Sequence, residues 1–344
     1  MTTTVGIVGA TGAVGQRFVQ LLDGHPGFEI GALTASSESA GTPYHAAAKW
    51  RIDTPIPDTV ADMTVRETTP DAVPDDLDLL FSSLPSGVAE EVEPRFCEAG
   101  YVVSSNSSNE RLADDVPLVI PEVNHDHLEL IEVQRQERGW DGALIKNPNC
   151  STITMVPTLA ALDEFGLERI TVSTLQAVSG AGYSGVTSME IIDNVLPYIG
   201  GEEEKMETES RKLLGTPSAD GVDWHDVTVS ASCNRVPTID GHLENVWVGL
   251  NEDVSVETAA EAMRAAPSLD LPHSPEPLIE VFEDPDRPQP RLDRMLGDGM
   301  QIAVGGIQAT ESGLQYDCLA HNTIRGAAGA SLLNGELLVE EGWI

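Results

Sequence analysis

The sequence has few basic residues for its length. Its 344 residues include 19 lysines and arginines against 56 aspartates and glutamates, a formal net charge of −37 at pH 7, and lysine occurs only at Lys49, Lys146, Lys205 and Lys212. Such a surface repels nucleic-acid phosphates and anionic lipids, so we expect neither nucleic acid nor a membrane as a partner. The acidic residues are spread along the chain, which predicts a solvated surface that needs strong salt screening, as in the cytoplasm of a halophilic archaeon.

Cysteine is also scarce. It occurs at Cys97, Cys150, Cys233 and Cys318, with no C-x-x-C pair and no histidine cluster at metal-ligand spacing. This pattern is typical of free thiols in a reducing cytosol and argues against a disulfide framework and a metal site. The sequence shows no signal-peptide pattern and no apolar run near the roughly 20 residues that span a bilayer. We therefore expect a soluble, cytoplasmic protein.

Short apolar runs alternate with helical segments in the first half of the chain. This alternation is typical of an α/β fold with a doubly wound parallel sheet. The chain length predicts two domains, the first ending near Lys146. Strands are expected at 5–8, 29–34, 63–65, 77–81 and 101–104, with a helix at 87–99.

The second half predicts a separate, more open sheet. A stretch rich in proline and aspartate, 267–290, is expected to be a surface excursion, and a last helix at about 323–338 to pack back on the first domain. Strands are expected at 170–176, 225–230, 246–250, 301–308 and 314–319, with helices around 186–195 and 202–214.

A glycine-rich turn, Gly9 to Gly15, follows the first strand and opens a helix. In this context the pyrophosphate of a dinucleotide lies at the helix N-terminus, so we assign cofactor contacts to Gly9, Thr11, Gly12, Ala13 and Val14. The spacing is G-x-x-G-x-x-G rather than G-x-G-x-x-G, and a plain tight turn is the alternative.

The segment Asn147–Thr152 presents Cys150 as a nucleophile. Pro148 ends a strand, and the residues after Cys150 predict a helix that begins at the cysteine. Unpaired N–H groups at such a helix end would lower the thiol pKa and could bind an oxyanion. A buried structural cysteine is the alternative.

Arg235 and His242 lie seven residues apart around a proline and a glycine. This spacing suits a loop that directs both side chains into one pocket. A guanidinium binds a carboxylate through two hydrogen bonds, and an imidazole transfers protons near neutral pH. The alternative is a surface arginine and an unrelated histidine.

Taken together and in order, these motifs resemble the aspartate-semialdehyde dehydrogenases, their archaeal and fungal branch more than the typical bacterial one. The resemblance covers essentially the whole chain. It is carried by Gly9–Gly12, Asn147–Thr152, Gln176–Gly182, Gly200–Lys205, and Arg235–Pro237 followed by Gly241–His242.

This resemblance implies a Rossmann-type dinucleotide-binding domain of residues 1–148 plus the C-terminal helix, about 323–344. It also implies an α+β catalytic and dimerisation domain of residues 149–322, and a homodimer or homotetramer. The expected reaction is the NADPH-dependent reductive dephosphorylation of 4-phospho-L-aspartate to L-aspartate 4-semialdehyde, in the biosynthesis of lysine, threonine and methionine. An acyl-thioester reductase of the malonyl-CoA type on the same scaffold and a catalytically silent binding subunit are the alternatives.

The resemblance also implies roles for single residues. Cys150 is expected to form a thioacyl-enzyme, with His242 as general acid and base and Gln176 orienting the acyl group. Arg235 is expected to bind the substrate α-carboxylate, and Glu202 the α-amino group.

Lys205 and Arg111 resemble the phosphate-binding pair of the family. The alternatives are a solvated ion pair for Lys205, which lies in a glutamate-rich helix, and an exposed arginine for Arg111. Gly182 is expected to contact the cofactor, and Asn322 matches a family asparagine near the nicotinamide, although Asn322 also fits a helix N-cap.

The second strand ends without an acidic residue that could hold a free ribose 2′-hydroxyl. Ser36, Ser37 and Ser39 can bind a 2′-phosphate, which favours NADP. Glu38 and Thr42 stand where the family more often carries arginine and lysine, so NAD remains open.

Overall fold

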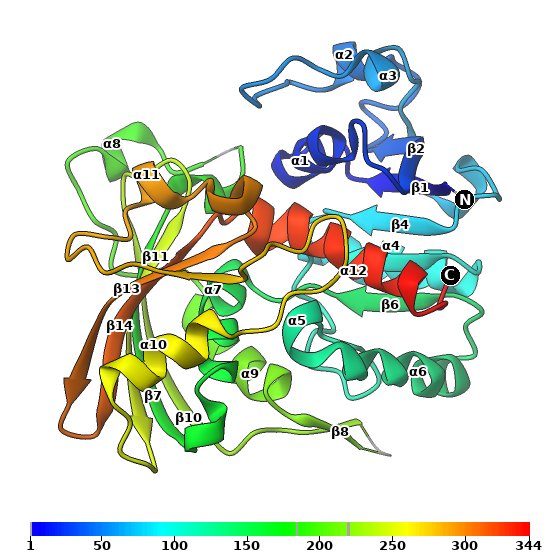
Figure 1. Ribbon diagram of the computed structural model, residues 1–344. Coiled ribbons are helices and arrows are strands. Elements are labelled where there is room, and N and C mark those ends of the chain that lie inside the picture. The colour runs from blue at the N-terminus through cyan, green and yellow to red at the C-terminus, as the bar shows by residue number, and fades with distance from the viewer. Residues whose placement is uncertain (1, 184, 219–220) are drawn as a thin grey trace.

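The computed structural model describes residues 2–183, 185–218 and 221–344 and contains two six-stranded sheets (Figure 1). The first sheet is wholly parallel, with the order β3-β2-β1-β4-β5-β6, which confirms the predicted doubly wound α/β fold. Its strands are β1 (Thr3–Val8), β2 (Phe28–Ala35), β3 (Arg66–Glu67), β4 (Leu79–Ser82), β5 (Val102–Ser105) and β6 (Ala143–Lys146).

Helices bury both faces of this sheet. On one face, Phe18 of α1 (Ala13–Leu22) stacks on Phe81 with 5.0 Å between ring centroids, and α12 (Gly329–Glu340) packs beside it. On the other face lies α4 (Ser86–Glu98), whose Phe96 packs against Leu80. Burial on both sides explains why the strands are almost continuously apolar. The remaining helices of this half are α2 (Tyr44–Ala47), α3 (Asp58–Ala61), α5 (Pro121–Asn124) and α6 (Leu130–Arg138).

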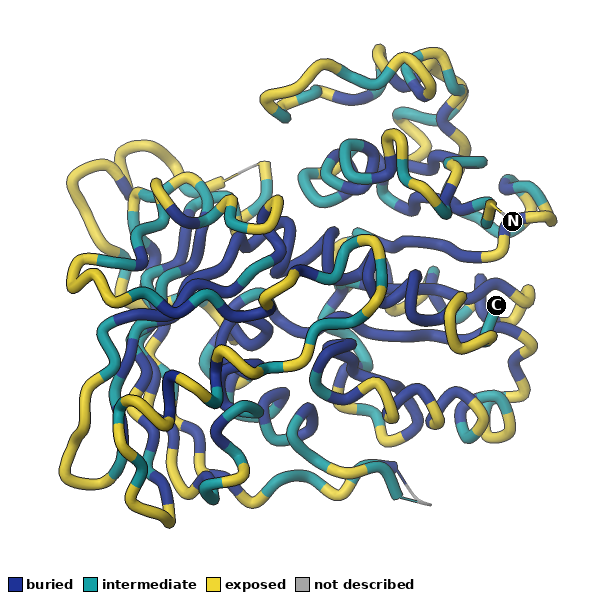
Figure 2. The backbone as a smooth tube through the Cα atoms, in the orientation of Figure 1, coloured by how far each residue is buried: buried dark blue, intermediate teal, exposed yellow. Residues whose placement is uncertain are grey.

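The second sheet is mixed, with the order β10-β7-β11-β14-β13-β12. Buried residues alternate with half-buried or exposed ones along β11, because helices cover only one face of the sheet (Figure 2). The strands are β7 (Leu167–Gln176), β10 (Thr228–Arg235), β11 (His242–Leu250), β12 (Ile279–Val281), β13 (Ile302–Thr310) and β14 (Gly313–Ala320). The covering helices are α7 (Cys150–Ala160), α9 (Glu202–Leu213) and α10 (Val256–Arg264).

Two local expectations are wrong. The strand expected at 63–65 forms at Arg66–Glu67, where the chain pairs with Thr34 and Ala35 of β2. The helix expected around 186–195 is reduced to α8 (Ser188–Ile191). Leu196 exchanges two backbone hydrogen bonds with Arg235, which holds the chain after α8 in an extended course.

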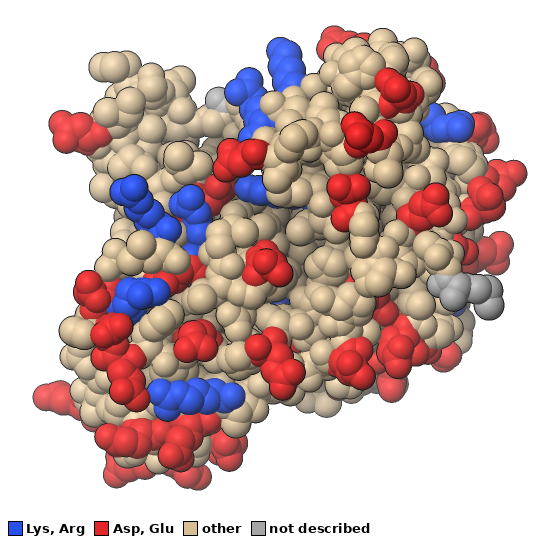
Figure 3. All heavy atoms as spheres, turned by 45° about the horizontal axis from the view of Figure 1, so that its top comes forward, with Lys and Arg blue, Asp and Glu red and all other residues tan. Residues whose placement is uncertain are grey.

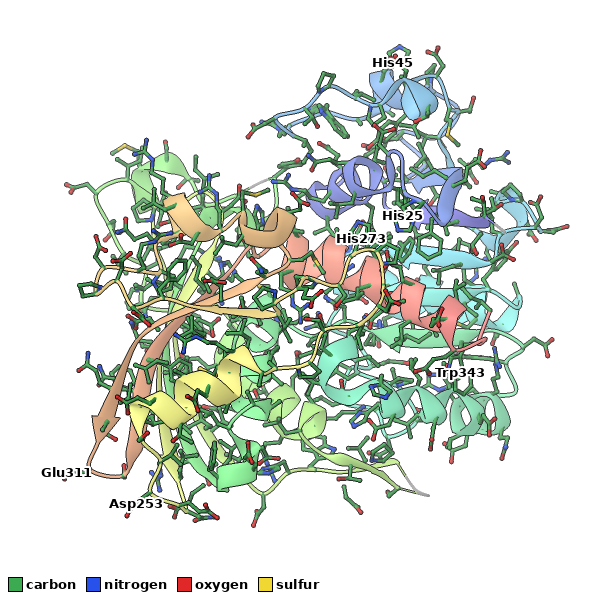
Figure 4. All side chains as sticks on the ribbon, viewed as in Figure 1. His25, His45, Asp253, His273, Glu311 and Trp343 are labelled. Carbon is green, nitrogen blue, oxygen red and sulfur yellow. The ribbon has the colours of Figure 1, made fainter. Side chains whose placement is uncertain are left out.

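The stretch 267–290 is also more than a surface excursion, because it contributes β12 to the edge of the second sheet. It is anchored to the first half of the chain by His273, which stacks on His25 with 4.9 Å between ring centroids (Figure 4). Glu336 of α12 accepts a hydrogen bond from each ring, 2.6 Å from His273 Nδ1 and 2.8 Å from His25 Nε2.

These three side chains are of metal-ligand types, but their hydrogen bonds indicate a structural link. The Nδ1 of His25 accepts the backbone N–H groups of Gly27 and Phe28, at 3.0 and 2.9 Å. Its proton therefore lies on Nε2, which faces Glu336 and is not free to bind a metal.

Acidic side chains far outnumber basic ones over the face drawn in Figure 3, on both halves of the molecule. This distribution agrees with a solvated acidic surface rather than an acidic tail. Among the described residues, no helix is long and apolar enough to cross a membrane.

The link between His25, His273 and Glu336 predicts a pH-dependent contribution to stability. Burial alone would raise the pKa of Glu336, but hydrogen bonds from both histidines outweigh it and hold the pKa below its ordinary value of 4.5. The contribution is therefore present above about pH 4.5 and lost as the pH falls through the lowered pKa. We expect Glu336→Gln to cost about 2 kcal/mol near neutral pH, and the difference from wild type to shrink in acid.

Urea unfolding at constant salt and a series of pH values measures this difference. Glu340→Gln, an exposed change on the same helix, serves as the control. Equal stabilities of wild type and Glu336→Gln at neutral pH, or a difference that grows in acid, would contradict the prediction.

Candidate active site

A cavity of about 360 Å³ lies where the two sheets meet. Both halves of the chain line it, because the carboxyl ends of the parallel strands and the start of α7 face each other there. Its lining includes Ala13, Val14, Ser107, Ser108, Arg111, Cys150, Gly182, Glu202, Lys205, Arg235 and Asn322.

Cys150 is the first residue of α7, and Asn149 caps the helix. The Asn149 side-chain oxygen accepts the N–H groups of Ser151 and Thr152, at 2.9 and 3.2 Å. No described residue accepts a hydrogen bond from the Cys150 N–H. This N–H is therefore able to bind a substrate oxygen at the helix end.

Two carboxylates of α9 hold the capping residue in place. Glu209 accepts the Asn149 backbone N–H at 2.6 Å, and Glu202 accepts its side-chain amide at 2.8 Å. The residue before the nucleophile is thus fixed from both ends, so the position of Cys150 depends on α9 as well as on α7.

His242 faces the nucleophile. Its Nε2 lies 3.3 Å from Cys150 Sγ, and its Nδ1 accepts the Ala177 N–H at 3.1 Å. The neutral ring therefore carries its proton on Nε2, directed at the sulfur. Burial, reinforced by Arg235, lowers the pKa of His242 to about 3, so the ring is uncharged at neutral pH.

The expected lowering of the thiol pKa is wrong for the free protein. Burial, with a smaller contribution from Glu202, raises the pKa of Cys150 to about 12, although Arg235 and Arg111 act in the opposite direction. The side chain lines the cavity, but loss of water is the largest cause of the raised pKa.

Arg235 and Glu202 present opposite charges to the cavity. Arg235 donates to the Ala177 carbonyl at 2.7 Å, and Gly180 lies so close that a Cβ there would be 2.8 Å from Arg235 Nη1. Burial alone would raise the pKa of Glu202, but Lys205, together with hydrogen bonds from Lys205, Asn149 and Gln176, holds it below its ordinary value. The glutamate is therefore ionised beside the nucleophile.

The two predicted phosphate ligands, Lys205 and Arg111, line the same cavity. Lys205 forms an ion pair with Glu202 at 2.8 Å, as the alternative interpretation expected. Its side chain also lines the cavity. Arg111 is buried, so the alternative of an exposed arginine is wrong. It pairs with Glu209 at 2.8 Å and donates to the Asn106 carbonyl at 2.7 Å.

The predicted cofactor residues fall into three groups. Ala13, Val14, Gly182 and Asn322 line the cavity, and Gly9, Thr11 and Gly12 form the turn that leads into α1. Ser36, Ser37 and Ser39 lie beyond the end of β2, and the cavity lining does not include them.

The turn fits a dinucleotide. Gly9 has a φ of +85°, and a Cβ on Gly15 would collide with the Gly9 carbonyl. Gly12 caps α1 without a side chain, which leaves the first N–H groups of the helix accessible to a pyrophosphate.

Asn322 connects two loops of the site. Its side-chain oxygen accepts the Gly241 N–H and its amide donates to Ser179 Oγ, both at 2.8 Å. The alternative of a helix N-cap is wrong, because the following π-helical turn, Ile324–Ala328, begins after Thr323.

Gln176 lies behind the residues that line the cavity and is not one of them. It is fully buried, and its Nε2 donates to Ser151 Oγ and to Glu202 Oε2, the latter at 3.3 Å. Its Oε1 has no hydrogen-bond partner among the described residues.

Sequence reasoning missed several residues of the site. Ser107 and Ser108 follow β5, and their place after a predicted strand could have revealed them. No sequence signal points to Glu209 or Ala177, whose roles depend on packing. Gly326 approaches the nucleophile so closely that a Cβ there would be 2.8 Å from the Cys150 Cβ.

Comparison with known proteins follows the two halves of the chain. Residues 4–131 match the model of the semialdehyde dehydrogenase NAD binding domain, and residues 159–325 match that of the semialdehyde dehydrogenase dimerisation domain. The aspartate-semialdehyde dehydrogenase of Archaeoglobus fulgidus is 53% identical over 342 residues, with 99% of each chain covered. That of Schizosaccharomyces pombe is 45% identical over 351 residues, with 98% of each covered.

Solved structures of the same family resemble this fold over nearly the whole chain. Aspartate-semialdehyde dehydrogenase with NADP from Candida albicans has a TM-score of 0.91 and 40% identity, with 100% of each chain covered. Aspartate-semialdehyde dehydrogenase II complexed with ASA from Vibrio cholerae has a TM-score of 0.79 and 28% identity, with 99% of each covered. The chain belongs to the aspartate-semialdehyde dehydrogenase family, as its sequence motifs and its site geometry both indicate.

Proposed function

We propose that this protein reduces 4-phospho-L-aspartate to L-aspartate 4-semialdehyde with NADPH, releasing phosphate, in the pathway to lysine, threonine and methionine. The observation that carries this proposal is the approach of Cys150 Sγ to His242 Nε2, 3.3 Å, in a cavity that Arg235, Lys205 and Arg111 also line. Cations at a nucleophilic cysteine suit a small anionic acyl phosphate.

The charges around the cavity suggest how the substrate binds. Arg235 binds the α-carboxylate, and Glu202, which is ionised, accepts the α-ammonium group. Lys205 and Arg111 bind the phosphate, assisted by the hydroxyl groups of Ser107 and Ser108 on the same lining.

The first half of the reaction takes place on Cys150. Its sulfur attacks the acyl carbon, a carbon–sulfur bond forms, the bond to the phosphate oxygen breaks, and the thiol proton leaves with the phosphate. The single Nε2–H of the neutral His242 faces the sulfur in the free protein and donates to the substrate oxygen once the sulfur has bonded to carbon. Gln176, which contacts Ser151 in the first turn of α7, orients the resulting acyl group.

When bound along the glycine turn, NADPH supplies the hydride that reduces the thioester carbon. The His242 Nε2–H and the Cys150 N–H hold the oxygen of the hemithioacetal. The carbon–sulfur bond then breaks, the aldehyde leaves, and the sulfur recovers a proton from solvent. NADP is preferred, because Ser36, Ser37 and Ser39 follow β2 without a carboxylate at the strand end.

We also propose a homodimer formed through the uncovered face of the second sheet, with a homotetramer as the larger alternative. The match of residues 159–325 to a dimerisation domain supports this assembly. Trp247 of β11, with 40% of its surface exposed, marks the uncovered face. The domain division at 148 and 322 stays a prediction.

The reaction is tested in the direction of aldehyde oxidation. With aspartate semialdehyde and NADP in concentrated KCl, NADPH should form only when inorganic phosphate is present. Cys150→Ala should lower the rate by at least about 10³-fold, because no other thiol can form the acyl-enzyme. The same assay with NAD measures the cofactor preference.

Turnover without phosphate would contradict the roles of Lys205 and Arg111. No turnover with either cofactor would contradict the proposed reaction and direct attention to acyl-thioester substrates.

Lys205→Met separates a phosphate ligand from a mere ion pair. Loss of a charged hydrogen bond to the phosphate should raise the KM for phosphate by at least about tenfold, with less effect on the KM for the aldehyde. Arg264→Met is the control, because Arg264 lies on α10 and lines a different cavity, beside Glu283. An unchanged KM for phosphate in Lys205→Met would contradict phosphate binding by Lys205 and leave its ion pair with Glu202 as its only role.

The surface charge predicts a requirement for salt. At a net charge of −37, repulsion should destabilise the fold until salt screens it, since the Debye length falls from about 10 Å at 0.1 M to about 3 Å at 1 M. We expect the thermal unfolding midpoint to rise steeply with KCl between these concentrations. Sucrose at matched osmolality is the control, and an equal rise in sucrose would contradict a screening mechanism.

A further inference from the structure

Glu209 is a buried carboxylate that contacts two parts of the active site, and the proposed reaction gives it no role. It lies on α9 with 2% of its surface exposed and is not among the residues that line the cavity. Its Oε1 accepts a hydrogen bond from Arg111 Nη1 at 2.8 Å, and its Oε2 accepts the Asn149 backbone N–H at 2.6 Å. Both oxygens therefore bind protein groups rather than a substrate.

The two partners of Glu209 belong to segments with different tasks. Arg111 lies in the loop after β5 and lines the cavity, where it is proposed to bind the phosphate. Asn149 caps α7 and is followed directly by the nucleophile Cys150. The two partners are 98 and 60 positions away from Glu209 in the chain. One carboxylate thus joins the phosphate ligand to the start of the helix that carries the nucleophile.

The chemistry of acyl transfer depends on how these two segments are placed. In the direction of aldehyde oxidation, a phosphate oxygen attacks the thioester carbon on Cys150, a carbon–oxygen bond forms and the carbon–sulfur bond breaks. The phosphate gives up a proton, and the sulfur takes it. Both the phosphate oxygen and the sulfur must reach one carbon in this step, and a displacement of about 1 Å can cost about 10²-fold in rate. Hydride transfer to the cofactor does not involve the phosphate.

Other contacts hold both segments independently of Glu209. The Arg111 carbonyl accepts a hydrogen bond from Lys212 Nζ at 2.9 Å, and Arg111 Nη2 donates to the Asn106 carbonyl at 2.7 Å. The side-chain oxygen of Asn149 caps α7 by itself. What Glu209 adds is the direct link between the Arg111 guanidinium and the Asn149 N–H.

We propose that Glu209 is a positioning residue that holds the Arg111 guanidinium in a fixed place relative to Cys150, so that the phosphate is aligned with the acyl carbon during transfer. The inference rests on the proposed function, in which Cys150 carries the acyl group and Arg111 binds the phosphate. Glu209 serves the acyl-transfer half of the reaction, and hydride transfer does not depend on it.

Glu209→Gln separates the two contacts. Its amide has one accepting oxygen and one donating amino group, so it satisfies only one of the two donors. The Asn149 N–H is part of the backbone and cannot turn away, whereas the Arg111 side chain can. The oxygen should therefore keep the Asn149 N–H, and the guanidinium should lose its partner. We expect kcat/KM for phosphate to fall by at least about tenfold, with the KM for the aldehyde within about threefold.

The first turnover isolates the hydride step. Concentrated enzyme mixed with aldehyde and NADP, without phosphate, should form at most one NADPH per Cys150, an amount too small to appear in the turnover assay. The rate of this burst in Glu209→Gln should be within about threefold of wild type. Phosphate added to the acyl-enzyme then restarts NADPH formation, which should be at least about tenfold slower in the variant. A burst slowed as much as this second phase, or a second phase as fast as in wild type, would overturn the proposal.

Two further variants separate positioning from charge. Glu209→Asp keeps the charge but is one methylene shorter, so its oxygens cannot reach both partners, and kcat/KM for phosphate should fall as in Glu209→Gln. The double variant Glu209→Gln/Arg111→Met should lose no more kcat/KM for phosphate than Arg111→Met alone, because Glu209 acts through Arg111. Wild-type kinetics in Glu209→Asp, or additive losses in the double variant, would overturn the mechanism.

Glu207→Gln is the matched control. Glu207 lies on the same helix, accepts the Ala231 backbone N–H at 3.2 Å and does not line the cavity. Its amide oxygen can keep that contact, so its burst and its kcat/KM for phosphate should equal those of wild type. All variants are compared at a temperature where circular dichroism shows them folded. A loss in Glu207→Gln as large as in Glu209→Gln would mean general damage to α9 and would overturn the proposal.

The wild type and Arg111→Met distinguish this inference from the proposed function. An inactive wild type, or an Arg111→Met variant with wild-type kinetics for phosphate, would refute the proposed function. An active wild type that needs both phosphate and Arg111, together with an equally active Glu209→Gln, would refute the role of Glu209 alone.

Discussion

The active site depends on the capping of α7 by Asn149. The chain leaves the first sheet at Lys146 and enters α7 at Cys150, so the nucleophile lies at the junction of the two sheets. Asn149 holds the helix start through two backbone N–H groups and is itself held by Glu202 and Glu209 of α9. Cys150, the two carboxylates of α9 and Arg111, which pairs with Glu209, are therefore coupled through a few hydrogen bonds.

Three of the four lysines lie in the interior or at the cavity, and the fourth, Lys49, is exposed. Lys146 is fully buried against Glu93 at 2.6 Å, and Lys212 donates to the carbonyl groups of Arg111, Ala113 and Val116. Lys212 thus fixes the segment that carries Arg111 to α9, and Lys205 lines the cavity. Acidic side chains outnumber basic ones on the face drawn in Figure 3. The protein thereby combines a strongly negative exterior with a cavity that Arg111, Lys205 and Arg235 line, and such positive charge attracts small anions.

Local sequence signals predicted much of the site. The glycine turn, the start of α7 at Cys150, and the pair Arg235 and His242 all have short-range patterns, because backbone geometry and helix capping are local properties. The thiol pKa was not predictable in this way. Its direction depends on how much protein surrounds the sulfur, because burial is the largest cause of the raised pKa. The tautomer of His242 likewise depends on the Ala177 N–H, which lies 65 positions away in the chain.

The sequence by itself determined the family motifs, the parallel α/β first half and the acidic surface, because each follows from composition or from short periodic patterns. Tertiary structure decided which charges meet. It brought Arg111 to Glu209 and Gln176 to Ser151. It also made part of the stretch 267–290 an edge strand and anchored this stretch through His273. The physical reason is that burial and hydrogen-bond partners are set by residues far apart in sequence, and only the packing of both sheets brings those residues together.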